Sequence, residues 1–511
     1  SRMYSEIATL EASRMRVGDR PAVPATDAAA HLDSSTAPRR EGSMRSRAFV
    51  AFLLLLRATS AAAAPSGPEF QVNSTSAGDQ GYPALCVTAD GAAVLAWESR
   101  GQDGAGNAVV AARRAADGTP HGGEQVLSAA APAGDQQAPA IACGRDGGFL
   151  VVWESQLEPG ADFTIEARRV LPNGVSLQEP MRSPPGTQRG AAACAGRAYT
   201  VVWYGETEAG GYDVFFRSTS SPAAPSVVNA SPGSHRHAAV ACSTADGNLD
   251  VVVWEQRDRD GDGGAIVARR VGVVQVVGDE VQVNTTTVGD QRLPAIAALA
   301  DGAFLVAWES EGQDGDESAI VARRLGADLT PLGDEFVVNS VAAFSQEQPA
   351  VAAAGRGALV AWSSSGDGDG YGVFARRVGL DGSPVGAEVL LNTTTAGTQG
   401  AVSDEGGGLA AAGNARGDLL IAWQSLRLRG VAADGDGLGI FARRGALPRR
   451  CAGDCNSDGA VAIDELVRGV TLALTDGVPA GCAALDADGD GRVVIAELIA
   501  AVAAALNGCA Q

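Results

Sequence analysis

Two short acidic stretches near the C-terminus carry the oxygen ligands that calcium prefers. The first reads DCNSDGAVAIDE from Asp454, and the second reads DADGDGRVVIAE from Asp486. In a twelve-residue calcium loop, side chains at positions one, three, five and twelve and a backbone carbonyl at position seven bind the ion, with a glycine at position six. Both stretches match this pattern in full, which predicts two bound Ca²⁺ ions. The predicted ligands are Asp454, Asn456, Asp458, Ala460 and Glu465, then Asp486, Asp488, Asp490, Arg492 and Glu497.

A helix must follow each loop to hold its last glutamate in place. Apolar residues recur after both loops with i, i+3, i+4, i+7 spacing, which predicts one amphipathic helix per loop. We expect the two apolar stripes to bury each other. They comprise Ile463, Leu466, Val467, Val470 and Leu474, then Ile495, Leu498, Ile499, Val502 and Leu506. Prolines, glycines and cysteines leave no room for a helix before either loop.

This duplicated loop-helix segment, residues 451–509, resembles a type I dockerin, a module that binds cohesin in cellulosomes. The resemblance implies calcium binding and attachment to a cohesin-like or other surface protein. Positions ten and eleven, often Ser-Thr in cohesin binders, are here Ile463-Asp464 and Ile495-Ala496. The segment also holds four cysteines, for which three disulfide pairings are open. They are Cys451, Cys455, Cys482 and Cys509.

Upstream of this segment, one stretch is repeated seven times. Its clearest copy reads AFLVAWES followed by GQDGDESAIVARR, and each copy contains one tryptophan. The seven tryptophans lie 56, 50, 51, 54, 54 and 61 positions apart, a spacing typical of a repeat architecture. They are Trp97, Trp153, Trp203, Trp254, Trp308, Trp362 and Trp423. The repeat resembles the VVWxSxGQDGxG arrays of large secreted bacterial proteins.

Each repeat predicts four short antiparallel strands. In the fifth repeat we expect strands at 294–299, 304–309, 320–325 and 335–339, with Asp301-Gly302 as a hairpin turn. Seven such units over residues 68–447 predict an all-β, seven-bladed β-propeller of four-stranded antiparallel blades. The array begins with a lone fourth strand at 69–73 and ends with a third strand at 440–444. The N-terminal strand should therefore complete the last blade, whereas an open solenoid would leave both edges bare.

Several polar positions recur in the propeller, and each has a structural and a functional interpretation. A GDQ turn before each first strand could ring one mouth of the propeller or simply bond within the turn; its residues are Gln80, Gln136, Gln188, His235, Gln291, Gln346 and Gln399. His235 and His237 are a possible metal pair. Aspartates of the second turn suit either calcium or plain turn chemistry; they are Asp258, Asp260, Asp262, Asp314, Asp316, Asp367, Asp369, Asp434 and Asp436.

Arginine pairs end the third strand of most repeats. We expect them to meet the glutamates that follow the tryptophans in cross-strand pairs. The glutamates are Glu98, Glu154, Glu255 and Glu309, and the pairs begin at Arg113, Arg168, Arg269, Arg323, Arg376 and Arg443. Four further cysteines occupy corresponding strands of the first four repeats, a repeat apart, where we expect buried free thiols. They are Cys86, Cys143, Cys194 and Cys242.

Composition and the N-terminus indicate the compartment. The formal net charge is −21, and no lysine occurs, which disfavours nucleic acid or an anionic membrane as a partner. Residues 1–43 are predicted to be an irregular, non-native extension. Residues 44–64 read as a signal peptide, whose apolar run is shorter than the roughly 20 residues of a membrane span. We therefore expect a secreted or cell-surface bacterial protein that is monomeric.

The sequence predicts binding more strongly than catalysis. No G-x-S-x-G or H-E-x-x-H motif and no Asp-box turn occurs, and Tyr204 beside Glu206 is the one unusual pair after a tryptophan. The favoured hypothesis is a secreted, calcium-binding, non-catalytic propeller for a protein or glycan ligand, with a dockerin-like module for attachment. The alternative is a polysaccharide-acting, sialidase-like hydrolase recruited through its dockerin. Two carboxylates 5 to 10 Å apart in one mouth, one with a raised pKa, would favour the alternative.

Overall fold

A computed structural model describes most of the repeat array and parts of the tail. The described residues are 67–446 except 129–133, 209, 244–248, 356, 401–405 and 427–436, and then 453–455, 461–474, 482, 485 and 493–507. The predicted extension 1–43 and signal peptide 44–64 lie outside the described residues.

Seven antiparallel sheets, each predicted as one blade, follow one another along the chain. The first three are β2 (Gln80–Val87), β3 (Ala93–Arg100), β4 (Asn107–Arg114), β5 (Gln125–Val126); β6 (Gln136–Cys143), β7 (Phe149–Gln156), β8 (Phe163–Val170), β9 (Ser176–Gln178); and β10 (Gln188–Ala195), β11 (Tyr199–Glu206), β12 (Tyr212–Ser218), β13 (Ser226–Val227). The next two are β14 (His235–Ala241), β15 (Asp250–Arg257), β16 (Gly264–Val271), β17 (Val276–Gln282); and β18 (Gln291–Ala298), β19 (Phe304–Glu311), β20 (Ser318–Leu325), β21 (Phe336–Val337).

The last two sheets differ slightly from the others. The sixth contains β22 (Gln346–Ala354), β23 (Gly357–Ser364), β24 (Gly372–Gly379) and β25 (Pro384–Leu390), with a 3₁₀ turn η1 (Ser365–Asp367). The seventh has an inner strand in two pieces and takes its outer strand from the N-terminus. Its strands are β26 (Thr398–Gln399), β27 (Leu409–Gly413), β28 (Asp418–Leu426), β29 (Gly439–Ala446) and β1 (Phe70–Gln71).

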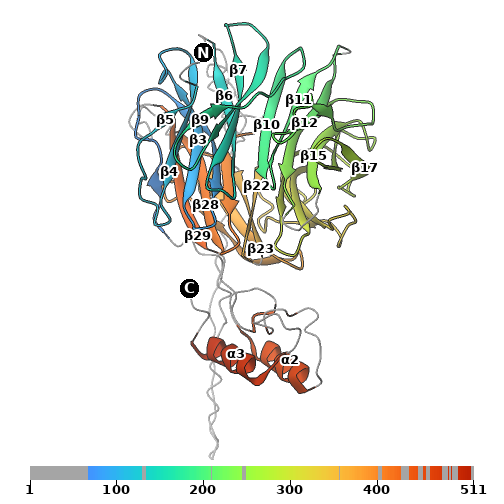
Figure 1. Cartoon of the computed structure of the whole chain (residues 1–511). Helices are drawn as coiled ribbons and strands as arrows, with labels where there is room; N and C mark the ends of the chain where they lie inside the picture. Colours follow the sequence, from blue (N-terminus) through green and yellow to red (C-terminus); the bar gives the residue numbers. More distant parts are fainter. Residues whose placement is uncertain are drawn as a thin grey trace, which may run out of the picture. The chain divides into compact units, whose positions relative to one another are not determined.

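The first strands of the sheets form a closed ring. Each of β2, β6, β10, β14, β18, β22 and β27 contacts the next, and β27 contacts β2. Figure 1 shows the last blade, with β28 and β29 in orange, beside the first blade in blue. The predicted seven-bladed β-propeller is therefore confirmed.

The predicted N-terminal closure is also confirmed. Phe70 pairs with Ala442 and Gln71 with Phe441, and the Val72 N–H donates to the Ile440 carbonyl at 2.8 Å. The Asn73 side chain accepts from the Ile440 N–H at 2.9 Å, and Glu69 accepts from the Thr393 N–H at 2.6 Å. The closing strand thus joins both the last blade and the segment before it, which removes two open sheet edges.

The core lies between blades, because each sheet buries both faces against its neighbours. Trp308 is fully buried and packs with Val306 of its own blade and with Val251 and Ile266 of the preceding blade. The other six tryptophans are also buried. The prediction that the indoles pack between neighbouring blades is confirmed where the clusters are described.

Disulfides correct the prediction of free thiols in the propeller. Cys86 is bonded to Cys143, and Cys194 to Cys242, with 5.5 Å between the Cα atoms of each pair. Equivalent residues a repeat apart in sequence are close in space here, because inner strands of adjacent blades converge on the axis. Their separation falls within the 4.4–6.8 Å range that a disulfide needs.

The tail contains two helices, α2 (Ile463–Leu474) and α3 (Ile495–Asn507), which contact each other. A third disulfide joins Cys455 to Cys482, which selects one of the three open pairings; Cys451 and Cys509 lie outside the described residues. Neither helix, nor any other in the described chain, has the length and apolar character needed to cross a membrane. Three disulfides are typical of a protein exposed to an oxidising compartment.

Candidate functional site

The first strand of each of the first six blades begins with the same unusual backbone conformation. The third residue of the strand has a φ between 48° and 61°, in the left-handed region, and the pairing with the second strand shifts there in each blade. The residues are Tyr82, Ala138, Gly190, His237, Leu293 and Gln348. This β-bulge places the second and third residues of all six strands at one end of the ring, which we call the bulge end.

The repeated glutamines close turns and do not line a mouth. All six are buried. The Gln291 amide, for example, donates to the Val288 and Gly289 carbonyls at 3.1 and 2.9 Å, and its oxygen accepts from Asn284. The turn interpretation of these residues is therefore confirmed, and the mouth interpretation is wrong.

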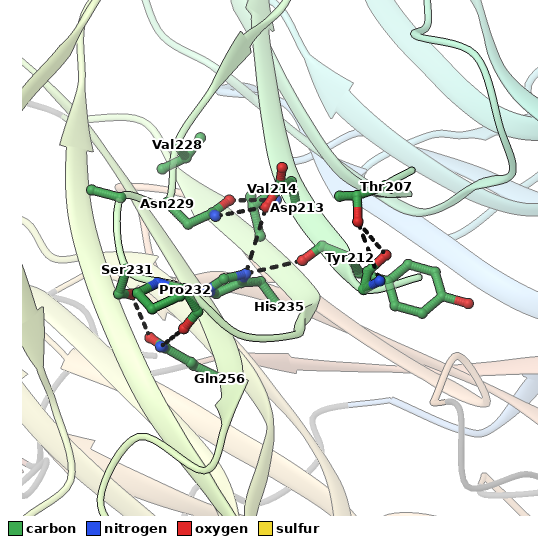
Figure 2. Close-up of polar contacts among 12 residues, drawn as sticks. Thr207, Tyr212, Asp213, Val214, Val228, Asn229, Ser231, Pro232, His235 and Gln256 are labelled. Atoms are coloured by element: carbon green, nitrogen blue, oxygen red, sulfur yellow. Dashed lines mark hydrogen bonds and ion pairs between the residues drawn. The ribbon is translucent and has the colours of Figure 1, made fainter. Parts of the chain in front are cut away.

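His235 takes the glutamine position in the fourth blade (Figure 2). Its Nδ1 lies 2.9 Å from the Tyr212 carbonyl, which can only accept, so Nδ1 carries the proton. Gln256 from the neighbouring strand supplies the missing amide and donates to the Pro232 carbonyl at 3.2 Å. His235 is thus a buried structural residue.

His237 does not join His235 in a metal pair. Its Nδ1 lies 2.7 Å from Glu255 Oε2, while the His235 ring faces Trp254 and Tyr212. Burial acts to raise the pKa of Glu255, but the hydrogen bond and charge of His237, with Arg257 and Arg292, outweigh it and lower the pKa. Glu255 is therefore ionised at neutral pH and holds the imidazole.

The other glutamates after the tryptophans cap the bulge of the next blade. Glu154 accepts from the Gly190 N–H at 2.8 Å and from Arg189 at 2.7 Å, and Glu98 accepts from the Ala138 N–H at 3.4 Å. In the seventh blade, Gln424 does the same for the Tyr82 N–H at 3.0 Å. The recurrence of this contact indicates a structural role.

Glu98 has the most perturbed titration among these carboxyls. Burial raises its pKa to about 7, and the charges of Asp135, Glu154 and Asp79 add to the rise, against the hydrogen bond from Ala138. Its other oxygen accepts from Asn107 at 2.6 Å. A raised pKa is one part of the glycosidase criterion, but Gln424 makes the same capping contact in the seventh blade, so this contact indicates a structural role for Glu98.

The predicted pairing of these glutamates with the arginine pairs is wrong. In the fifth blade, Arg323 lies opposite Val306 in the ladder, whereas Glu309 lies opposite Ile320. The antiparallel register thus separates the two charges. Arg323 donates instead to the Gly333 carbonyl at 3.1 Å and to Val283 of the preceding blade at 2.8 Å. The first arginine of each such pair links neighbouring blades in the same way at Arg269, Arg376 and Arg443.

The aspartates of the second turn are also used structurally. Asp260, Asp314 and Asp367 each accept from the asparagine that ends the same blade, at 3.0, 2.6 and 3.2 Å. Asp262 and Asp316 accept from the N–H groups of Gly289 and Phe344 in the turn that follows. Turn chemistry accounts for these five carboxylates. Asp434 and Asp436 lie outside the described residues.

In the tail, the structure places three of the predicted calcium ligands. Asp454, Glu465 and Glu497 are all buried. Glu465 accepts from the Cys455 and Ala462 N–H groups at 2.7 and 2.8 Å, and Glu497 from the Val494 N–H at 2.9 Å. Both position-twelve glutamates are thus held at the first turn of a helix. Outside the described residues lie Asn456, Asp458, Ala460, Asp486, Asp488, Asp490 and Arg492.

The expectation that the two apolar stripes bury each other is wrong for most of their residues. Leu466 and Leu498 do pack into the small core, with Leu485 and Ala501. The helices approach closely at Gly469 of α2, where a Cβ would lie 2.9 Å from the Leu498 side chain of α3. The glycine therefore gives Leu498 room at the contact, and the other large apolar residues of both stripes, apart from Leu466, face outward. The exposed residues are Ile463, Val467, Val470, Leu474, Ile495, Ile499, Val502 and Leu506.

Comparisons with known proteins add little beyond the fold. No family model and no curated protein sequence matches the chain. Similar solved structures include a protein of unknown function from Dyadobacter fermentans (12% identity, TM-score 0.45, 74% of this chain and 98% of that chain). A streptogramin B lyase (11%, 0.43, 74% and 97%) and the subtype N11 neuraminidase-like protein of A/flat-faced bat/Peru/033/2010 (10%, 0.40, 61% and 87%) are also similar. At these identities, the likeness says nothing about activity.

Proposed function

We propose that this chain is a secreted, calcium-binding protein of bacterial type, in which a non-catalytic propeller is attached to a cohesin-like protein through a dockerin-like tail. The observation that carries the proposal is the apolar face of the tail helices. Ile463 and Leu474 are 80% and 81% exposed, and their equivalents in the second unit, Ile495 and Leu506, are 74% and 79% exposed.

The exposed residues of the two helices are equivalent in pairs. Val467 and Val470 of α2 correspond to Ile499 and Val502 of α3, 32 positions later in each case. Contiguous exposed apolar surface marks an interaction site, and its duplication offers a partner two near-identical faces. A cohesin-like protein that offers an apolar surface is the partner whose chemistry fits.

The described carboxylates support calcium binding in the tail. Asp454, Glu465 and Glu497 occupy positions one and twelve of their loops and are withdrawn from water. Burying several carboxylates in so small a core is costly unless positive charge compensates them. Calcium bound by these residues would supply that charge and would fix the start of each helix, and therefore the docking face.

The test is binding of the full chain to an immobilised recombinant type I cohesin, measured with calcium and with EDTA. We expect calcium-dependent binding that the double variant Val470→Asp/Val502→Asp weakens by at least about tenfold, because it places charge in the centre of both faces. The matched control Val341→Asp changes an exposed valine of the propeller and should bind normally. Absence of binding by the unaltered chain, or full binding by the double variant, would contradict attachment through this face.

A further inference from the structure

The blade 3 to blade 4 interface at the bulge end departs from the repeat in a way that turn chemistry does not explain. Where Glu98, Glu154 and Glu309 cap the bulge of the following blade, the third blade has Tyr204. Its ring meets His237 edge-on at 6.0 Å and Tyr212 at 5.5 Å. The capping carboxylate that the preceding blade supplies elsewhere is therefore replaced here by an aromatic ring, and Glu255 is the carboxylate that remains beside it.

Arg236 lies in the same place and has no ion pair within the described chain. Its neighbours in the ring, Arg189 and Arg292, hold the same strand position and are bonded to Glu154 and Glu309 at 2.7 and 2.8 Å. The residue opposite Arg236 in the strand pairing is Glu255, whose carboxylate is already hydrogen-bonded to His237. The Arg236 guanidinium lies instead over the Tyr212 ring, 4.4 Å from its centroid.

His237 contributes a hydrogen-bonding atom to this group. Because Glu255 is ionised and accepts only, Nδ1 of His237 carries the proton and Nε2 remains for another partner. The side chain is 18% exposed, so the ring is held by a buried carboxylate yet borders solvent. At the other described bulge positions stand Tyr82, Ala138, Gly190, Leu293 and Gln348, none of which offers an imidazole.

We propose that Arg236 and His237 form a binding site for a small hydroxy-carboxylate, of which an acidic sugar is the representative. A planar guanidinium pairs with a carboxylate through two parallel hydrogen bonds, and an imidazole Nε2 bonds a neighbouring hydroxyl, as acceptor when the ring is neutral and as donor when it is protonated. Tyr212 holds the guanidinium flat, and Glu255 fixes the imidazole. This inference rests on the proposed function of the propeller as a binding domain and adds the class of ligand that it binds. It does not depend on the tail.

Isothermal titration of the full chain with D-glucuronate tests the site, with D-glucose as the uncharged sugar and acetate as the carboxylate without hydroxyls. We expect saturable binding of glucuronate, none of glucose, and weaker binding of acetate. Arg236→Gln and His237→Gln should each weaken glucuronate binding by at least about tenfold. The controls Arg145→Gln and His121→Gln, both exposed residues of other turns, should bind normally.

A second measurement uses the unaltered protein, so a variant that fails to fold cannot obscure the result. In imidazole ¹⁵N spectra, glucuronate should shift the Nε2 resonance of His237 and leave that of His121 unchanged. No saturable glucuronate binding, or equal binding by Arg236→Gln, would overturn the proposal. The propeller site should bind glucuronate in EDTA as well, because it needs no calcium. Its success or failure is therefore measured separately from that of the calcium-dependent tail.

Discussion

The residue after each tryptophan has different roles in different blades, although the fold of the blades is the same. The residue after the tryptophan caps the next blade as Glu98, Glu154 or Gln424, yet becomes Tyr204 beside His237. The cap needs only an acceptor atom, so charge is not required of it. Because no charge is required at this position, the third blade can have Tyr204 there, at the bulge end.

Glu98 gives a prediction about pH. Its pKa is raised from 4.5 to about 7, so the folded state holds this proton more tightly than the unfolded state does. The stabilisation is therefore complete below pH 4.5 and is lost as the pH rises through 7, by at most about 3 kcal/mol. Glu98→Gln keeps an acceptor, as Gln424 does, and should stabilise the protein at pH 8 relative to the unaltered chain.

The measurement is urea unfolding of both proteins at pH 5 and pH 8. We expect Glu98→Gln to be the more stable of the two at pH 8, with the advantage shrinking or reversing at pH 5. The matched control is Glu206→Gln, an exposed glutamate at the end of β11. A stability difference for Glu98→Gln that is equal at both pH values would show that its carboxyl does not titrate as described.

At the scale of elements, strands were easier to predict than their ends and partners. Alternating small and β-branched residues with Asp-Gly turns indicate four strands per repeat, and all four appear. The first strand of the fifth blade was predicted to begin at Pro294 but begins at Gln291, because the bulge at Leu293 lets the strand continue past it. A left-handed leucine has no sequence signature.

Side-chain partners were harder still, because they depend on register and on the packing between blades. The arginine pairs look like partners for the glutamates in sequence, but the antiparallel ladder sets them opposite the residues that precede the tryptophan. In the tail, apolar periodicity predicts an inward stripe, whereas Gly469 and Ala501 let a smaller face make the contact. The sequence shows Tyr204 and His237 as departures from the repeat, but it does not show that Tyr212 contacts both Tyr204 and Arg236.

Packing of the second strands gives a prediction about stability. Trp308 has no exposed surface and fills the space between the fourth and fifth blades. Trp308→Ala should destabilise the propeller by roughly 3–5 kcal/mol, since it leaves a cavity that the surrounding strands cannot close. Trp308→Phe should cost less, because it retains a ring. Urea unfolding measures both, and a loss below about 1 kcal/mol for the alanine variant would argue against inter-blade packing.

At the scale of the whole propeller, two devices add to the packing between blades that holds the ring of sheets together. The disulfides join the first blade to the second and the third to the fourth, closing loops of 57 and 48 residues. In the chain-entropy account, each such link stabilises the fold by about 4 kcal/mol. The cysteines were predicted to be free, although their restriction to four consecutive repeats is compatible with two neighbouring pairs.

The second device is the N-terminal strand. The sequence predicts that it closes the ring, because the array begins with a lone fourth strand and ends with a third. Deleting residues 69–73 removes the β1 pairing, the buried Val72 and the bonds of Glu69 and Asn73. We expect a loss of at least about 3 kcal/mol across the whole propeller, because both edges open. Thermal unfolding checks this, with a deletion of residues 1–43 as the control. Unchanged melting after loss of 69–73 would mean that the ring closes without this strand.

The proposed attachment of this protein depends on the tail being a calcium-bound docking module. The most direct measurement is the number of Ca²⁺ ions that the EDTA-stripped full chain binds in isothermal titration. We predict two ions for the unaltered chain, one for Glu465→Gln or Glu497→Gln, and two for the control Asp464→Asn, whose side chain is exposed beside Glu465. Absence of bound calcium, or two ions in both glutamine variants, would contradict the account.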